Sequence, residues 1–307
     1  MNHSQPENPV TGIIAEIAGL LHFSKEAMAT TFDIFIQSDN DTYAGQACAA
    51  AFNILDNLES KLSRFIENGD IARINNLAVN TPLILSLEAF ESLEMCVKLY
   101  RQTLGAFDVT AGLLVSTVLD KLQNPKSPVQ TSTLPIKLDK NTHTIQVLED
   151  SIKIDLGGFG KGYAIDEMAE LLLDWDVKTS LVSCRSTVLA VGLPPDNKGW
   201  PLTMTNPKTS QLLTSFRLKS GSVSGSGLQK GCHIMDPRKA LPATGKIAAW
   251  AAASDAATAD ALSTAFMVMS PEEIKKYCLK HKDTSGLIIT EKNNVLSFGK
   301  WKEELVL

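Results

Sequence analysis

The sequence predicts an α+β fold whose sheets are largely antiparallel. Three observations indicate this fold class. Predicted helices and strands are mixed along the chain, without the strict alternation that is typical of a parallel sheet. Residues 42–62 carry apolar side chains at helical spacing, whereas residues 29–37 alternate between apolar and polar side chains. Residues 287–290 and 295–298 are two short apolar runs around a polar turn, which is typical of an antiparallel hairpin.

The first elements follow from these patterns. Residues 1–24 are expected to form a polar lead and a short amphipathic helix. Residues 29–37 are predicted to be a strand with one apolar face. The predicted helix over residues 42–62 presents a single apolar stripe, which consists of Ala44, Ala47, Cys48, Ala51, Leu55, Leu58 and Leu62.

The later elements are delimited by caps and breakers. Ser86 is a favourable N-cap for a helix that reaches residue 103, and three prolines predict a loop over residues 123–135. Ser254 is predicted to cap an alanine-rich helix, and Ser270 with Glu273 predicts a capping box for the last helix. Strands are expected at residues 179–191, 201–205, 212–218, 221–224 and 246–253.

Composition excludes several classes of function. The chain has 307 residues, a formal charge of −5 and a pI near 5.6, which argues against a nucleic-acid-binding surface. Its five cysteines are scattered and show no Cys-x-x-Cys pair, so buried free thiols are expected rather than disulfides or a zinc site.

The N-terminus has no basic region, and Glu16 and His22 interrupt the apolar run of residues 13–23. As written, the chain therefore predicts a cytoplasmic protein without a transmembrane segment; a longer natural N-terminus would allow export.

The densest signal is the run of residues 152–166, in which a short strand is expected to lead through glycines into a helix. Gly157, Gly158 and Gly160 precede Lys161. Such a turn can present backbone N–H groups and a lysine to a phosphate. The spacing matches neither the P-loop nor the dinucleotide fingerprint. A tight strand-to-helix turn without a ligand is an equal alternative.

Two other segments carry reactive side chains. Asp260, Ser263 and Thr264 share one face of a predicted helix, and their hard oxygen donors suit Mg²⁺. Close packing of small residues on an alanine-rich helix explains the same pattern. His233 stands beside Asp236 and Arg238 and is a candidate general base, although Asp236-Pro237 also begins ordinary turns.

The order of these pieces carries more information than any one of them. Six blocks stand in sequence: Met28-Ala29-Thr30-Thr31-Phe32, Ser63-Arg64-Phe65, Gly105-Ala106-Phe107-Asp108-Val109-Thr110, Asp155 to Asp166, His233-Ile234-Met235-Asp236-Pro237-Arg238 and Asp260-Ala261-Leu262-Ser263-Thr264. This arrangement resembles the ApbE family, the FAD:protein FMN transferases. The resemblance runs from Met28 to the C-terminal hairpin.

The resemblance implies a fold and an activity. It implies two intimate lobes around a flavin-binding cleft, with residues 25–307 as a single domain after the lead of residues 1–24. Family members use Mg²⁺ and transfer the FMN half of FAD to a serine or threonine hydroxyl of an acceptor protein, releasing AMP. The expected acceptor carries a Ser/Thr flavinylation motif and is a redox protein.

The resemblance also assigns roles to residues of this chain. His233 would be the catalytic base. Metal ligands would be Asp260 and Thr264, with Ser263 and the backbone of Gly158 nearby. The residues expected to contact FAD are Met28, Phe65, Ala106, Phe107, Asp108, Asp155, Lys161 and Met235.

Some positions depart from the family pattern. Arg185 and Ser186 stand where the family has glycines, Ser226 stands where it has a carboxylate, and Ala240 replaces a turn glycine. A loss of transfer would leave an FAD-binding protein, and water as the acceptor would make an FAD pyrophosphatase. The sequence predicts the transferase first.

Overall fold

The computed structural model describes residues 20–111, 134–150, 152–206, 209, 211–228 and 234–301. Most of the predicted lead, most of the loop predicted over residues 123–135, and His233 lie outside the described residues.

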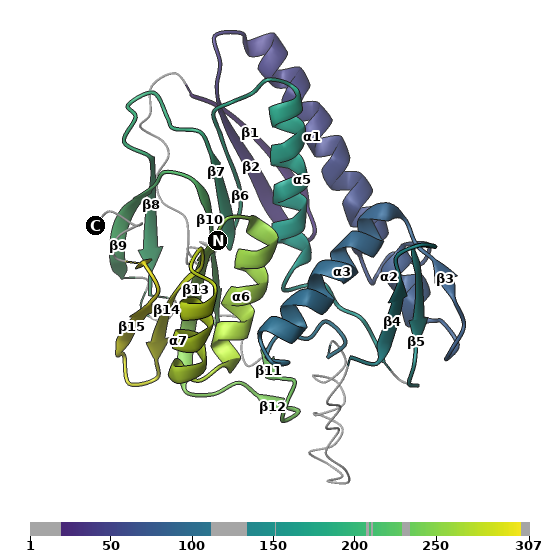
Figure 1. Ribbon diagram of the computed structural model, residues 1–307. Coiled ribbons are helices and arrows are strands. Elements are labelled where there is room, and N and C mark those ends of the chain that lie inside the picture. The colour runs from purple at the N-terminus through teal and green to yellow at the C-terminus, as the bar shows by residue number, and fades with distance from the viewer. Residues whose placement is uncertain are drawn as a thin grey trace, which may run out of the picture.

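A single antiparallel sheet organises the fold (Figure 1). Every neighbouring pair of its eight strands is antiparallel, which confirms the predicted α+β class. In spatial order the strands are β1 (Leu20–Ala27), β2 (Thr30–Gln37), β6 (Ser180–Cys184), β7 (Thr187–Val191), β10 (Gly221–Gly227), β13 (Lys246–Ala253), β14 (Ser285–Thr290) and β15 (Val295–Phe298).

The two faces of this sheet are covered differently (Figure 1). Helices α1 (Asp41–Leu62), α5 (Gly160–Asp174) and α6 (Ala256–Val268) pack on one face and enclose the larger core. On the other face, the hairpin of β8 (Trp200–Thr205) and β9 (Leu212–Leu218) encloses a second core around Trp200 and Trp250. Helix α7 (Pro271–Lys280) follows α6 and contacts β14 and β15.

A smaller part of the molecule lies beside the C-terminal end of α1 (Figure 1). It comprises α2 (Asp70–Asn75), α3 (Leu87–Gln102) and the three-stranded sheet of β3 (Leu83–Ile84), β5 (Thr144–Val147) and β4 (Ile136–Asp139). A short hairpin of β11 (Met235–Asp236) and β12 (Leu241–Pro242) completes the described elements.

Local chemistry explains where the helices begin. The Ser86 side chain accepts from the Ala89 N–H at the start of α3, and Ser270 and Glu273 form the predicted capping box of α7. The prediction for α6 was wrong by one residue, because Asp255 rather than Ser254 is the N-cap and accepts from the Thr258 N–H.

Two further predictions were wrong. Residues 20–24 belong to β1 rather than to an N-terminal helix, because their backbone pairs with β2 along the whole strand. Residues 152–154 form no strand beyond an isolated bridge between Ala111 and Lys153. The Asn75 side chain takes the place of a strand partner: its Oδ1 accepts from the Ile154 N–H at 2.6 Å and its Nδ2 donates to the Ile154 carbonyl at 2.9 Å.

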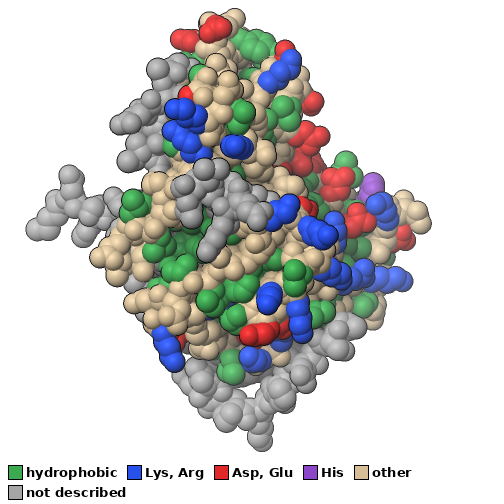
Figure 2. Space-filling model, turned by 60° about the vertical axis from the view of Figure 1, so that its left-hand side comes forward, with side chains coloured by type: hydrophobic (Ala, Val, Ile, Leu, Met, Phe, Trp, Pro, Cys, Tyr) green, Lys and Arg blue, Asp and Glu red, His purple; other side chains and the backbone are tan. Residues whose placement is uncertain are grey.

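The surface and the cysteines complete the description. Cys48, Cys96, Cys184 and Cys278 are buried free thiols, as predicted for them. Among the described residues, no helix is long and apolar enough to cross a membrane. On the face shown in Figure 2, side chains of both charges are interspersed with hydrophobic ones.

Candidate functional site

A cavity of about 720 Å³ is lined by residues of the large sheet, of α1, α5 and α6, and of the segment that follows α3. Its wall is built from segments that are far apart in the sequence: residues 28–30, 62–65, 106–109, 111, 155–158, 160–161, 185–186, 225–227, 234–235 and 237, with Glu59, Asp260 and Thr264. The fold therefore gathers parts of all six blocks of the sequence pattern around one space.

The predicted site residues meet here. Every predicted FAD contact lines the cavity: Met28, Phe65, Ala106, Phe107, Asp108, Asp155, Lys161 and Met235. The predicted metal residues Gly158, Asp260 and Thr264 also line it, whereas Ser263 is fully buried behind this wall. The predicted base His233 lies outside the described residues, directly before Ile234 in the cavity wall.

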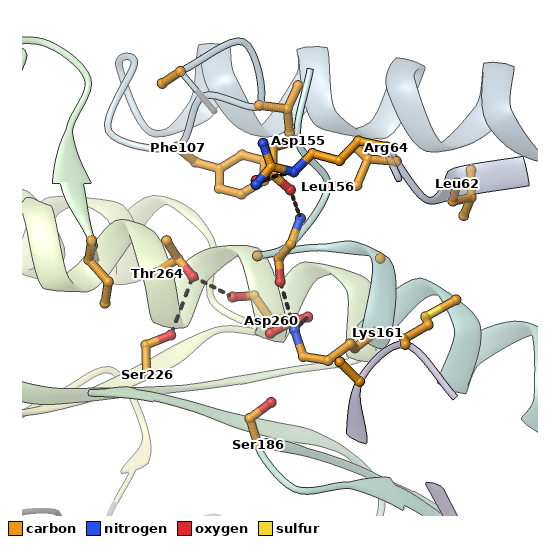
Figure 3. A pocket seen from close by; sticks show the side chains of 18 of the residues that line it. Leu62, Arg64, Phe107, Asp155, Leu156, Lys161, Ser186, Ser226, Asp260 and Thr264 are labelled. Carbon is orange, nitrogen blue, oxygen red and sulfur yellow. Dashed lines mark hydrogen bonds and ion pairs between the residues drawn. The ribbon is translucent and has the colours of Figure 1, made fainter. Parts of the chain in front are cut away.

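Asp260 is the buried anion of the cavity, with only 3% of its surface exposed. Its Oδ1 accepts a hydrogen bond from the Ser224 hydroxyl at 3.3 Å. Its Oδ2 accepts from the Gly162 N–H at 3.2 Å and pairs with the Lys161 ammonium at 3.4 Å. Three donors from α5 and β10 thus fix the orientation of a carboxylate that belongs to α6. Figure 3 shows one of them, Lys161, beside Asp260.

Hydroxyl groups adjoin this carboxylate. The Ser226 and Thr264 hydroxyls lie 3.3 Å apart (Figure 3). The Ser226 and Ser263 hydroxyls lie 2.8 Å apart. The Ser263 hydroxyl donates to the Asp260 carbonyl at 2.9 Å. Ser263 therefore supports the cluster from behind, while Ser226 and Thr264 present oxygen atoms at the cavity wall.

The donor set fits a hard divalent cation that also binds substrate oxygens. A Cβ added to Gly158 would lie 3.0 Å from Thr264 Oγ1, so only a glycine lets the backbone approach this hydroxyl so closely. Among the described residues no three His, Cys, Asp or Glu side chains form a metal-binding group. One carboxylate, one hydroxyl and one carbonyl suit Mg²⁺, which commonly takes its remaining ligands from water and phosphate.

Lys161 supplies a positive charge beside Asp260. Its ammonium donates to the Gly157 carbonyl at 2.7 Å and reaches Asp260 Oδ2 (Figure 3). Burial alone would lower the pKa of Lys161, but the nearby carboxylates of Asp260 and Asp155 and the other partners outweigh it, so its pKa is raised. Lys161 is therefore a cation at neutral pH.

The glycine turn at residues 157–160 differs from a phosphate-binding turn in the partners of its backbone N–H groups. The Gly157 N–H donates to Asp155 Oδ1 at 2.8 Å, and the Phe159 and Gly160 N–H groups both donate to the Leu156 carbonyl. These backbone donors are satisfied within the chain. The turn instead brings the Gly158 backbone and the Lys161 ammonium to the cavity.

An ion pair between Arg64 and Asp155 connects two segments of the opposite cavity wall. Arg64 Nε lies 3.4 Å from Asp155 Oδ2, and its guanidinium carbon lies 4.6 Å from the centre of the Phe65 ring. Phe65 is 81% exposed. An exposed aromatic ring with a cation beside it at the mouth of a cavity is suited to stacking on a planar ligand.

Asp108 lies in the segment that follows α3. Its Oδ1 accepts from the Thr110 N–H at 2.8 Å and from the Thr110 hydroxyl at 2.6 Å. Burial raises the pKa of Asp108, and the two hydrogen bonds from Thr110 offset part of this effect.

Comparison with known proteins agrees with this geometry. The sequence profile of the ApbE family matches residues 28–288. This chain belongs to the ApbE family. It is 24% identical over 267 residues to an FAD:protein FMN transferase of Buchnera aphidicola, covering 79% of this chain and 78% of the relative.

Solved structures of ApbE proteins share the fold. An ApbE protein of Thermotoga maritima superposes with a TM-score of 0.79 at 25% identity, covering 92% of this chain and 98% of that one. The flavin transferase ApbE of Vibrio cholerae superposes with a TM-score of 0.77 at 19% identity, covering 91% and 96%. The α+β architecture is thus that of ApbE proteins.

Three departures from the ApbE pattern lie at the cavity: Ser226 of β10, described above, and two residues of a turn. Arg185 and Ser186 form the tight turn between β6 and β7, and both line the cavity. The Gly225 N–H donates to the Ser186 carbonyl at 2.8 Å, which ties this turn to β10. Ala240 has a φ of +53°, a left-handed conformation that favours glycine, but it lies away from the cavity wall.

Sequence reasoning missed several cavity residues. Thr30, Glu59, Arg64 and Ser226 line the cavity although none was predicted to bind a ligand or a metal. The sequence did carry a signal for three of them, because Thr30 and Arg64 adjoin predicted contacts within their blocks and Ser226 stands where the family has a carboxylate. Glu59 lies inside a regular helix, and nothing local distinguishes it.

Asp166 fixes α6, the helix that carries Asp260, to α5. Its Oδ1 accepts from the Ala256 N–H at 2.7 Å and its Oδ2 accepts from the Ala257 N–H at 2.8 Å. Burial raises the pKa of Asp166 to about 7, an effect reinforced by the charges of Asp255 and Glu167 and opposed by the two N–H groups.

The pKa of Asp166 predicts a pH dependence of stability. Between its ordinary value of 3.8 and about 7, the folded protein holds this proton more tightly than the unfolded chain does. The contribution of Asp166 to the free energy of unfolding therefore falls as the pH rises through this range. Asp166→Asn should remove this decrease in the free energy of unfolding with pH. Urea unfolding of both proteins measures it from about pH 4 to about pH 7.5, roughly the interval between the unfolded and folded pKa values. Parallel curves for the two proteins would contradict the assignment.

Proposed function

We propose that this protein is an FAD:protein FMN transferase that requires Mg²⁺ and modifies a serine or threonine hydroxyl of an acceptor protein, releasing AMP. The observation that supports this most is the meeting of all eight predicted FAD contacts with Gly158, Asp260 and Thr264 around one cavity. Its volume of about 720 Å³ is in the range of small-molecule sites, roughly 300–1,000 Å³. The proposed acceptor is a redox protein with a Ser/Thr flavinylation motif.

The reaction is a phosphoryl-type transfer. The acceptor oxygen forms a bond to the phosphorus atom on the flavin side of the pyrophosphate. The bond from that phosphorus to the bridging oxygen breaks, and the bridging oxygen leaves with AMP. The hydroxyl proton passes to a base, for which His233 is the proposed group.

Asp260, Thr264 and the Gly158 backbone would hold the metal ion. When bound, Mg²⁺ supplies positive charge to the pyrophosphate oxygens. Ser224 and the Gly162 N–H keep the Asp260 carboxylate oriented, and Lys161 adds a cation at the same wall. Because these groups are fixed before the substrate binds, little reorganisation is needed as charge develops on the transferred group.

A single incubation tests the proposal. The full chain is mixed with FAD, Mg²⁺ and a protein domain that carries a family-type Ser/Thr acceptor motif, with EDTA in a parallel sample. We expect EDTA-sensitive AMP release together with an acceptor that has gained the mass of FMN. AMP and FMN without a change in the acceptor would indicate an FAD pyrophosphatase.

One observation favours a second function, that of an FAD-binding protein without transfer. Arg185 and Ser186 line the cavity where the family pattern has glycines, so their side chains occupy space that the nucleotide or the acceptor loop would otherwise use. FAD binding without any AMP release would support this function.

Arg185→Gly distinguishes the two functions. The Arg185 side chain is exposed at the cavity wall. For a working transferase we expect the substitution to change the rate of AMP release by only about twofold, which is typical of exposed positions. If the natural chain releases no AMP and the Arg185→Gly variant does, the natural chain is instead an FAD-binding protein without transfer.

A further inference from the structure

The turn between β1 and β2 forms one edge of the cavity. Met28 and Ala29 have φ values of +49° and +56°, and both line the cavity. A left-handed conformation is unfavourable for residues with a Cβ and occurs mostly where surrounding contacts impose it. One such contact is the hydrogen bond from the Met28 N–H to Glu59 Oε1 of α1 at 2.7 Å.

Thr30 follows this turn as the first residue of β2. Its side chain lies on the same face of the strand as Phe32, Ile34 and Ile36, which are fully buried under the helices. Thr30 is at the end of this face, where the helical cover gives way to the cavity that it lines. Only 9% of its surface is exposed.

The hydroxyl of Thr30 is buried without a partner. Among the described residues, its Oγ1 atom makes no hydrogen bond within the chain, whereas the hydroxyls of Ser226 and Thr264, which also line the cavity, bond to each other. A buried hydroxyl without a hydrogen bond destabilises the folded protein, and valine has almost the same shape without this defect. In the part of the chain that the structure describes, five buried side chains have such an unpaired atom, and of these only Thr30 lines the cavity.

We propose that the Thr30 hydroxyl hydrogen-bonds to the flavin nucleotide bound in this cavity. The inference rests on the proposed function only in the identity of the ligand, FAD. A hydroxyl can donate and accept, so it can pair with the carbonyl, imide or hydroxyl groups that a flavin nucleotide carries. The fixed turn at Met28 and Ala29 holds the hydroxyl in place before the ligand arrives, which limits the entropy lost on binding.

The test separates binding from folding with two variants. Thr30→Val removes the hydroxyl and keeps the shape, whereas Thr30→Ser keeps the hydroxyl. FAD affinity is measured by flavin fluorescence titration of each full chain without an acceptor, and the melting temperature of each is measured without FAD. We expect Thr30→Val to bind FAD about tenfold more weakly, since a tenfold loss corresponds to about 1.4 kcal/mol, the scale of one hydrogen bond. Thr30→Ser should stay within about threefold of the natural protein.

The melting temperature gives the second readout. Without FAD, Thr30→Val should melt at or above the temperature of the natural protein, because it buries no unpaired hydroxyl. An FAD affinity of Thr30→Val equal to that of the natural protein would overturn the inference, as would a Thr30→Ser variant that binds as weakly as Thr30→Val.

Different results would contradict the proposed function and this inference. A natural protein that binds FAD but transfers nothing to an acceptor would contradict the transferase, while the Thr30 comparison would still decide the hydrogen bond. A natural protein that binds no FAD would overturn both.

Discussion

Asp260→Ala is expected to abolish AMP release from FAD, with a loss of at least about a hundredfold in rate. Asp260 is a buried carboxylate in the cavity wall that Thr264 and Gly158 also line, and an alanine leaves the proposed metal ion without its charged ligand. The substitution also removes the partner of Lys161. The measurement is the rate of AMP release at saturating FAD over a series of Mg²⁺ concentrations.

Asp260→Asn is the matched control for folding. An amide keeps an oxygen for the Gly162 N–H or the Ser224 hydroxyl, so Asp260→Asn should unfold at a urea concentration close to that of the natural protein. It should nevertheless lose most of the activity, because it lacks the negative charge. Near-normal turnover by either variant at low Mg²⁺ would show that Asp260 does not bind the metal ion.

Gly162→Ala is expected to destabilise the protein by about 3 kcal/mol. A Cβ at this position would lie 2.2 Å from the Ala256 carbonyl oxygen and 2.8 Å from the Ala257 Cα. Both atoms belong to the backbone of α6, so α5 and α6 must move apart to admit one methyl group. The same movement pulls the Gly162 N–H away from Asp260. Urea unfolding measures the loss of stability.

Gly45→Ala provides the contrast. Gly45 lies within α1, and a Cβ there would meet only the Phe23 ring at 3.8 Å, an ordinary contact. Alanine favours a helix over glycine by about 0.5–1 kcal/mol, so this variant should be as stable as the natural protein or more so. If Gly162→Ala were as stable as Gly45→Ala, the close approach of α5 and α6 would not exist in solution.

Patterns within one element predicted that element well. The seven residues of the apolar stripe predicted for residues 42–62 are the same seven that α1 buries. Helical periodicity survives folding because each side chain's direction depends only on its own helix. The capping box of α7 was predicted for the same reason, since Ser270 and Glu273 complete it without any other part of the chain.

Interactions between distant residues explain the failures. Nothing near residues 152–154 shows that the Asn75 side chain will take the hydrogen bonds of a neighbouring strand. Residues 20–24 mix polar and apolar side chains, and this local pattern does not indicate a strand. They form a strand because they pair with β2.

The candidate site shows the same division. Motif order predicted which residues surround the cavity, because a resemblance carries three-dimensional information that composition does not. It gave no indication that Ser263 is fully buried behind the cavity wall, which depends on the packing of α6 against β10. Nor did it indicate that the Gly157, Phe159 and Gly160 N–H groups bond within the turn. The unpaired hydroxyl of Thr30 likewise becomes visible only when the helices and the sheet are in place.

The intact mass of the acceptor tests the central proposal most directly. The acceptor domain is incubated with FAD, Mg²⁺ and either the natural chain or Asp260→Asn, and the modified residue is then located by fragmentation. The proposal predicts one added FMN, linked through phosphate to a serine or threonine, that forms with the natural chain in step with AMP and is absent with EDTA or with Asp260→Asn. An acceptor of unchanged mass after the natural chain has released AMP from FAD would contradict transfer and leave hydrolysis as the activity of this cavity.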